Sequence, residues 1–137
     1  MQATEKNNNL VQVVALALQR KTDQMYLLTR RGPGQSGAGQ WEFPGGKIED
    51  GETQTQALVR EIKEELCFDL QEKELVFVSE HIEHYINKSV HIFLWKQVID
   101  FNPEFVLTEH DLSVWVPKVQ ILNYNLSTGD RPFVSRL

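Results

Sequence analysis

The sequence predicts an α/β (α+β) fold in which a mixed β-sheet is sandwiched between helices. Short apolar runs that are typical of strands stand on both sides of one segment with helical periodicity, and a short helical segment closes the chain. The length of 137 residues is that of a single domain. We therefore expect one domain over residues 10–137, preceded by a flexible N-terminal segment over residues 1–9.

The first part of the chain predicts two strands and a loop. Residues 10–19 and 24–30 are largely apolar runs separated by a short polar segment, which is typical of strands joined by a turn. Residues 32–39 contain four glycines and a proline, a composition typical of a surface loop. Residues 41–44 are expected to be extended and to lead into the glycine pair 45–46.

Residues 52–66 have the clearest helical pattern in the chain. Leu58, Ile62 and Leu66 are spaced i, i+4 and i+8, so they form an apolar stripe that a helix buries. The remaining segments are shorter. We expect strands over residues 74–84, 89–99 and 112–116, a helical turn over 117–122 and a short helix over 130–137.

Composition excludes several classes of partner. Nineteen acidic and fourteen basic residues give a net charge of −5, which does not suit long nucleic acid, because lysine and arginine supply most of that affinity. No apolar run approaches the ~20 residues that span a bilayer, so we expect no membrane partner. Cys67 is the single cysteine, so no intrachain disulfide can form and a reducing cytoplasm is expected.

Three glutamates near the end of the predicted helix indicate a metal site. Glu61, Glu64 and Glu65 are spaced i, i+3 and i+4, so their side chains share a sector about 100° wide beside the apolar stripe. They lie in the C-terminal half of the helix, where the macrodipole disfavours anions by a few tenths to ~1 kcal/mol each. A solvated acidic face leaves this placement unexplained. Bound Mg²⁺ or Mn²⁺ explains it, because these cations bridge carboxylates to substrate phosphates.

The surrounding pattern resembles the box of the Nudix hydrolase family. Gly46, five residues, Glu52, seven residues and then Arg-Glu-Ile-x-Glu-Glu-x-Cys-Phe over residues 60–68 follow the spacing of that box. The one departure is Cys67, which stands where the family has glycine. That glycine follows the helix, where a left-handed C-cap is common. A non-glycine residue there costs roughly 1–2 kcal/mol, so we expect the helix to end differently.

The resemblance extends to the MutT branch of the family over most of the chain. Residues 40–53, 91–95 and 130–132 are similar to MutT-type enzymes, as is Glu109, six residues before Trp115. Such enzymes hydrolyse oxidised guanine nucleoside triphosphates, such as 8-oxo-dGTP, to the monophosphate and pyrophosphate. The resemblance therefore implies the Nudix fold, a nucleoside triphosphate substrate and a Mg²⁺-dependent or Mn²⁺-dependent reaction. We expect a monomer or a weak homodimer.

The resemblance also implies roles for individual residues. It assigns metal binding to carboxylates and a backbone carbonyl, contributed by Glu61, Glu64, Glu65, Glu109 and the pair Gly45 and Gly46. Arg60 orients the glutamates, and Glu52 bonds this arginine or assists a metal-bound water. Phosphoanhydride hydrolysis also needs a base to take a proton from water. Glu61 is our first choice for this base and Glu109 the second.

Three further residues are candidates for substrate binding. Arg31 either clamps a phosphate or is simply solvated. Phe43, beside the box, is expected in the pocket, whereas Tyr85 and Trp95 are expected in the core. Asp130 matches a position from which MutT-like enzymes read a purine edge, and it is equally a candidate N-cap of the last helix. An ionised Asp130 would favour guanine over adenine, because guanine offers two adjacent donors.

Two other interpretations remain open. The same catalytic residues could act on an RNA 5′ end, a nucleotide sugar or a dinucleotide, because the box specifies neither the base nor the leaving group. The chain could also be a catalytically silent, nucleotide-sensing module. Such modules usually lose a glutamate of the box, and none is lost here.

Overall fold

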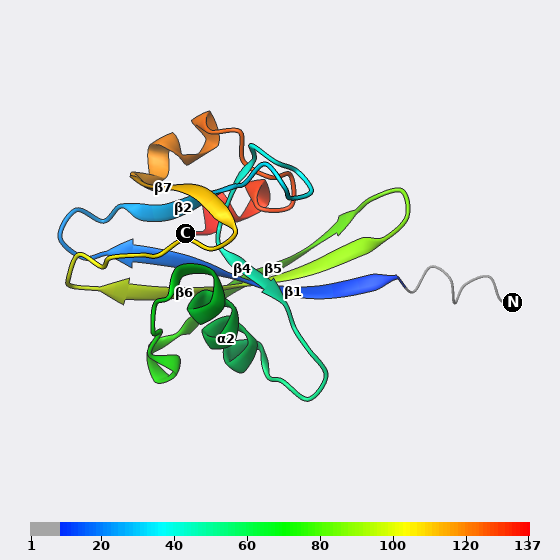
Figure 1. Ribbon diagram of the computed structural model, residues 1–137, viewed down its shortest axis with the longest axis horizontal. Coiled ribbons are helices and arrows are strands. Elements are labelled where there is room, and N and C mark those ends of the chain that lie inside the picture. The colour runs from blue at the N-terminus through cyan, green and yellow to red at the C-terminus, as the bar shows by residue number, and fades with distance from the viewer. Residues whose placement is uncertain (1–8) are drawn as a thin grey trace, which may run out of the picture.

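The computed structural model describes residues 9–137, and its strands form a seven-stranded mixed sheet (Figure 1). The strand order is β3-β2-β1-β6-β5, while β4 pairs with β1 and β7 pairs with β2. β1 and β6 are parallel along their full length, and the other pairs are antiparallel. The elements are β1 (Leu10–Arg20), β2 (Tyr26–Arg31), β3 (Trp41–Glu42), β4 (Gly45–Lys47), α2 (Gln54–Leu66), η1 (Glu72–Glu74), β5 (Val76–His84), β6 (Ser89–Ile99), β7 (His110–Val116), η2 (Lys118–Asn123) and η3 (Arg131–Arg136).

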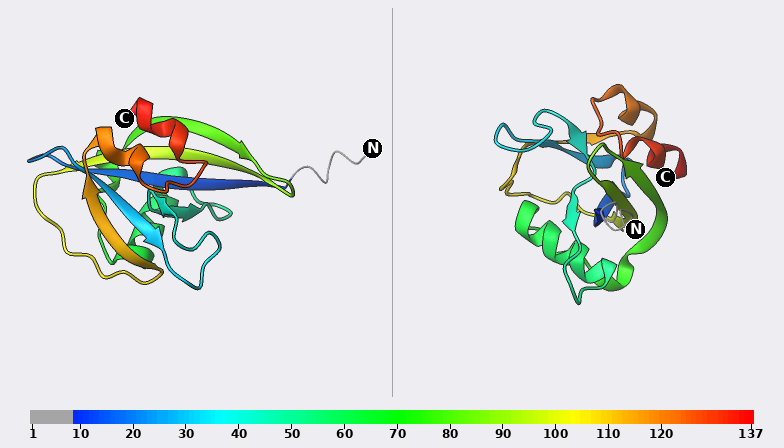
Figure 2. Two further views of the ribbon diagram at one scale, coloured as in Figure 1. Left: turned by 90° about the horizontal axis from the view of Figure 1, so that it is seen from above. Right: turned by 90° about the vertical axis from the view of Figure 1, so that its right-hand side faces the viewer.

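The two faces of the sheet bury separate cores, because side chains alternate along a strand. On β1, Val14, Leu16 and Leu18 pack with the helix α2. Ala15 and Ala17 point the other way and pack with residues of η2 and η3. Figures 1 and 2 show α2 on one side of the sheet and the two 3-10 helices on the other. The predicted sheet between helices is therefore confirmed.

The helix α2 begins at Gln54, two residues later than predicted. The reason is a capping box: the Thr53 hydroxyl accepts a hydrogen bond from the Gln56 amide at 3.1 Å, and the Gln56 side chain accepts one from the Thr53 amide at 3.0 Å. Glu52 therefore precedes the helix. The predicted apolar stripe is fully buried, and each such aliphatic side chain contributes roughly 1.5–3 kcal/mol.

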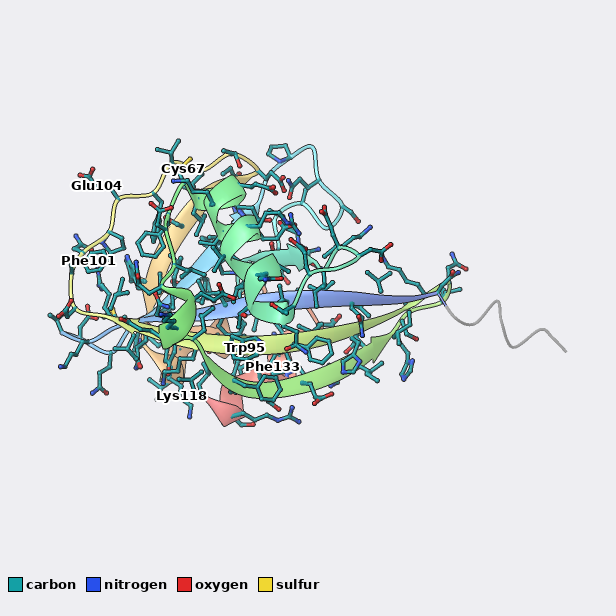
Figure 3. The ribbon with its side chains drawn as sticks, turned by 90° about the horizontal axis from the view of Figure 1, so that it is seen from below. Cys67, Trp95, Phe101, Glu104, Lys118 and Phe133 are labelled. Carbon is teal, nitrogen blue, oxygen red and sulfur yellow. The ribbon has the colours of Figure 1, made fainter. Side chains whose placement is uncertain are left out.

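The prediction for the end of α2 was wrong. Cys67 takes the left-handed conformation, at φ 55°, that the family's glycine would take. Its amide donates to the Lys63 carbonyl at 3.1 Å. The last turn gains further partners, since Thr108 donates through its amide to the carbonyl of Glu65 and through its hydroxyl to that of Glu64. These bonds offset the strain of a left-handed cysteine. Figure 3 shows Cys67 at the exposed end of the helix.

Other element boundaries differ by a few residues from those predicted. β5 starts at Val76, two residues later than predicted, because Glu74 still belongs to the 3-10 turn η1. β7 starts at His110, two residues early, and the final helix is a 3-10 helix, Arg131–Arg136. Residues 1–8 of the predicted flexible segment lie outside the described residues. No helix within residues 9–137 is long and apolar enough to cross a membrane.

Candidate active site

Arg60 lies at the centre of the predicted catalytic residues. Its guanidinium donates to both carboxylate oxygens of Glu52, at 2.7 and 2.9 Å. The same group donates to Glu61 at 3.0 Å, to Glu64 at 3.3 Å and to the Lys47 carbonyl at 3.0 Å. The structure thus brings Glu52, Glu61 and Glu64 together around one planar guanidinium, a group that can bind a carboxylate through two parallel hydrogen bonds. Arg60 therefore contacts the glutamates that it is expected to orient.

Glu52 is fully engaged in holding this arrangement. Hydrogen bonds from Arg60, and then from the Glu49 amide at 2.9 Å, lower the pKa of Glu52 to about 2. A carboxylate so strongly stabilised in its charged form is a poor proton acceptor near neutral pH. Of the two roles considered for Glu52, the geometry favours the bond to the arginine over assistance to a water.

Glu61 lies against the backbone of β4 at Gly46. A side chain at Gly46 would collide with the Glu61 carboxylate, so only glycine allows this close approach. Burial raises the pKa of Glu61, and the bonds from Arg60 oppose this shift. Its neighbours Glu64 and Glu109 raise the pKa further by charge repulsion. Glu61 is therefore held in place and is more basic than an ordinary glutamate.

Glu65 is the most unusual carboxylate of the group. It is 5% exposed, and its Oε1 has no hydrogen-bond partner. Burial raises the pKa of Glu65 to about 9, with further contributions from the charges of Glu61, Glu42 and Glu109. A buried oxygen without a partner costs about 1–3 kcal/mol. Its position among other carboxylates indicates that a cation is the missing partner.

Glu109 joins the cluster from a distant part of the chain. It immediately precedes β7, and Gln35 of the glycine-rich loop donates to its Oε1 at 3.1 Å. The approach of the two segments is close, because a side chain at Gly32 would meet the Glu109 carbonyl oxygen at 2.7 Å. The charge of Glu109 also raises the pKa of Glu61 and of Glu65, so the fold brings Glu109 near these two helix glutamates.

The residues present fit a divalent cation, although they do not already form a chelate. Within residues 9–137, no three His, Cys, Asp or Glu side chains converge closely enough to hold a metal ion as they stand. The reason is visible in the contacts: Arg60 draws Glu61 and Glu64 to its own guanidinium. The unpartnered Glu65 oxygen and the cleared space at Gly46 still mark the place where oxygen ligands are available.

A cavity of about 840 Å³ opens on the face of the sheet opposite α2, where Ala15 and Ile92 lie. The strands β1 and β6 form its floor with apolar residues such as Val13 and Ile92. Arg31 and Lys47 bring positive charge to its wall, and Glu42, which also lines it, is close enough to Glu65 to raise the pKa of that residue. A nucleotide-sized ligand requires a pocket of roughly 300–1,000 Å³ with a few polar groups. The cavity meets both conditions.

Asp130 lies in this cavity and does not cap the last helix. Its side chain makes no capping hydrogen bond to η3; instead, its Oδ2 accepts from the Phe43 amide at 3.0 Å. Burial raises the pKa of Asp130 to about 7, and the charge of Glu42 adds to the shift. The helix-cap interpretation was therefore wrong, because the chain turns Asp130 inward toward β3.

The structure corrects one of the aromatic predictions, that for Tyr85. Phe43 lines the cavity, but it is only 3% exposed and packs mainly in the core. Tyr85, expected in the core, is 47% exposed and lines the cavity at the tip of the β5–β6 hairpin. Trp95 packs against the core as predicted, and its indole donates to Gln54 of α2 at 2.8 Å. Figure 3 shows Trp95 on the strand beneath the helix.

Sequence analysis missed one cluster of polar side chains, formed by Glu42, Arg31 and His110. Glu42 of β3 accepts from the Arg31 guanidinium at 2.7 Å and contacts the imidazole Nε2 of His110 at 2.8 Å. Arg31 is thus an anchored residue of the cavity wall and not a freely solvated one. A single glutamate in a short extended segment carries no spacing signal, and these partners lie 11 and 68 residues away.

Comparisons with known proteins agree with this geometry. A family model described as the NUDIX domain matches residues 9–137. The CTP pyrophosphohydrolase of Escherichia coli (strain K12) is 36% identical over 125 residues, which cover 91% of this chain and 89% of that protein. The 8-oxo-dGTP diphosphatase of the same organism is 43% identical over 75 residues, which cover 50% of this chain and 58% of that protein.

Solved structures give the same result. The solution structure of the E. coli ORF135 protein matches with a TM-score of 0.77 at 34% identity and covers 93% of this chain and 87% of that chain. The MutT protein from Methanosarcina mazei Go1 matches with a TM-score of 0.82 at 23% identity, covering 93% of this chain and 91% of that chain, which is a likeness of fold alone.

These matches and the glutamate cluster define a hydrolase of phosphoanhydride bonds. The chain belongs to the Nudix family, in which it is MutT-like.

Proposed function

We propose that this chain hydrolyses a nucleoside triphosphate to the monophosphate and pyrophosphate with the help of Mg²⁺ or Mn²⁺. The observation that carries the proposal is the unpartnered, buried Glu65 oxygen near the charges of Glu61, Glu42 and Glu109, of which Glu42 also lines a cavity large enough for a nucleotide. The names of two relatives, a CTP pyrophosphohydrolase and an 8-oxo-dGTP diphosphatase, support the same type of reaction.

In this proposal Glu61, Glu64, Glu65 and Glu109 hold the cation, together with a backbone carbonyl of Gly45 or Gly46. When bound, the cation neutralises phosphate charge and makes water more acidic. Arg60 and Glu52 keep the glutamates in place. These residues leave the cavity wall free to bind the nucleotide.

The base proposed for the reaction is Glu61. The oxygen of water bonds to the α- or the β-phosphorus, and a proton of this water passes to Glu61. The P–O bond of the bridge between these two phosphates breaks, so that the monophosphate and pyrophosphate separate. Burial supports this choice because it raises the pKa of Glu61, whereas that of Glu52 is lowered to about 2. Glu109, held by Gln35, is the second candidate.

For the base of the nucleotide, oxidised guanine such as 8-oxo-dGTP is our first candidate and cytosine the second. An ionised Asp130 accepts two hydrogen bonds from the adjacent donors of guanine. A protonated Asp130 instead donates to N3 of cytosine and accepts from its amino group. Because the pKa of Asp130 is raised to about 7, both forms are populated near neutrality. The relative that matches over nine-tenths of the chain, a CTP pyrophosphohydrolase, specifically favours the second candidate.

The test is a product assay across a nucleotide panel. The panel contains 8-oxo-dGTP, dGTP, CTP, dATP and a 5′-triphosphorylated RNA, and the release of pyrophosphate and of phosphate is measured separately with Mg²⁺. We expect pyrophosphate from 8-oxo-dGTP or CTP at the highest kcat/KM. Phosphate release, or a preference for the RNA, would overturn the proposal, and no turnover of any member would favour a nucleotide-sensing module.

A further inference from the structure

Three strands bring one carboxylate, one guanidinium and one imidazole together between the cavity and the glutamate cluster. Arg31 ends β2, and His110 begins β7 directly opposite it in the strand pairing. Glu42 on β3 reaches both, with one oxygen on Arg31 Nε at 2.7 Å and the other on His110 Nε2 at 2.8 Å. Arg31 and Glu42 line the cavity, whereas the His110 side chain is only 1% exposed.

The burial of His110 is not explained by packing alone. Its Nδ1 is buried and has no hydrogen-bond partner within residues 9–137. An orphaned imidazole nitrogen destabilises a fold, so a stability role alone would favour an apolar residue at this position. His110 directly follows Glu109, a proposed metal ligand, in the chain. Its contact with Glu42 therefore fixes the backbone next to that ligand.

We propose that Glu42 is a positioning residue that couples nucleotide binding to metal binding. Through Arg31 it fixes the wall of the cavity, and through His110 it fixes the start of β7 and hence Glu109. The proposal gives Glu42 no role as a metal ligand; its two oxygens contact Arg31 and His110. This inference rests on the proposed function for the identity of the two ligands, but not on turnover.

The test measures binding of each ligand separately. Mn²⁺ alone is titrated into the nucleotide-free protein, and the α,β-methylene analogues of dGTP and CTP are titrated in the presence of Ca²⁺. The variants are Arg31→Gln and His110→Phe, singly and together, each made with Glu42 present and in a Glu42→Gln background. Double-mutant cycles isolate the coupling between Arg31 and His110.

We expect His110→Phe to weaken Mn²⁺ binding about tenfold, and to weaken analogue binding although His110 does not line the cavity. When Glu42 is present, the fold-change in analogue affinity of the double variant Arg31→Gln, His110→Phe should differ from the product of the two single fold-changes. In the Glu42→Gln background, His110→Phe should change either affinity by less than about twofold. His110→Gln, whose amide can donate to Glu42, should restore most of the loss.

The matched control is Asp111→Asn. Asp111 bonds Arg30 at 2.8 and 2.9 Å, so it joins the same two strands one residue further on, with both side chains about one-third exposed. We expect this variant to leave both affinities within about twofold. The coupling would be overturned if the fold-change of the double variant equalled the product of the single fold-changes with Glu42 present. It would also be overturned if Asp111→Asn weakened binding as much as His110→Phe. If the wild type hydrolyses no nucleotide, the proposed function fails, while the Mn²⁺ titrations still decide the role of Glu42.

Discussion

Two buried carboxylates, Glu65 on α2 and Asp130 before η3, differ in what surrounds them. Both are about 5% exposed, and burial raises the pKa of each, to about 9 for Glu65 and to about 7 for Asp130. Asp130 accepts a hydrogen bond from the Phe43 amide, whereas Glu65 keeps an oxygen without a partner among other carboxylates. The protein satisfies Asp130 by itself, whereas we propose that an external cation satisfies Glu65.

This difference separates the two halves of the proposed site. Glu65 lacks a hydrogen-bond partner for one oxygen and lies near other negative charges that only a bound cation would neutralise. Changes there should therefore affect catalysis far more than folding. Asp130 belongs to a region whose hydrogen bonds are already formed, so changes there should affect the choice of ligand and stability together. The predictions below test this division, from the largest expected effect to the smallest.

Replacing Glu61 or Glu64 with Gln should lower Mg²⁺-dependent kcat by about a thousandfold or more, because a cation ligand or the proposed base is lost. The fold should survive, as checked by circular dichroism. Glu65→Gln should have a similar effect on kcat and should raise the Tm of the metal-free protein, because folding then no longer requires the protonation of a buried carboxylate whose pKa is raised to about 9.

The control for this series is Glu104→Gln, on the exposed loop that follows β6, which should change neither quantity (Figure 3). Near-normal turnover of both Glu61→Gln and Glu64→Gln would contradict the metal assignment.

Gly46→Ala should lower kcat about 10- to 100-fold, because the added methyl would displace the Glu61 carboxylate and shift a proposed metal ligand by about 1 Å. Steady-state kinetics and Mn²⁺ titration check this. Gly34→Ala is the matched control, since its added methyl would meet no atom within 4 Å. Equal losses in the two variants would mean that the close approach of Gly46 to Glu61 is unimportant.

Asp130→Ala should erode the preference among bases about 10- to 100-fold in kcat/KM while lowering kcat less, because an unmatched buried polar pair costs ~1–3 kcal/mol. In the wild type, guanine nucleotides should gain relative to cytosine nucleotides as the pH rises through about 7, where Asp130 ionises. Ratios of kcat/KM between pH 6 and 8 measure this. A flat ratio would remove the base-reading role.

The same group should make folding pH-dependent in a defined direction. Because the pKa of Asp130 is about 7 in the folded protein and ordinarily 3.8, the folded state binds more protons than the unfolded state between these two pH values. Stability therefore falls as the pH rises from about 4 to 7, by up to about 1.4 kcal/mol per unit. Asp130→Asn keeps the oxygen that faces the Phe43 amide and should flatten this slope in urea unfolding. An unchanged slope would show that Asp130 does not titrate in this range.

Cys67→Gly should have the smallest effect, a gain in stability of about 0.5–1 kcal/mol without loss of activity, because glycine takes the left-handed conformation without strain. Thermal unfolding and kinetics check it. Gln24, at φ 61°, is the other non-glycine residue with positive φ within residues 9–137, so Gln24→Gly should give a comparable gain. A large loss of activity in Cys67→Gly would show a role for the thiol.

The sequence by itself determined the helix, its buried face and the spacing of its three glutamates. The i, i+4, i+8 stripe of Leu58, Ile62 and Leu66 and the offset of the three glutamates follow from helical geometry, which is local and periodic. The same holds for the long strands β1 and β6 and for the family. The sequence missed the capping box at Thr53, which two side chains three residues apart decide through individual hydrogen bonds.

Only the tertiary structure decided what depends on contacts between distant segments. The left-handed cap at Cys67 persists because the loop at Thr108 bonds the end of the helix, and Asp130 turns inward because the Phe43 amide is available there. The Glu42 link joins residues up to 68 positions apart. No local pattern encodes such pairs, because each is fixed by the packing of whole strands, which brings side chains together regardless of their separation in the chain.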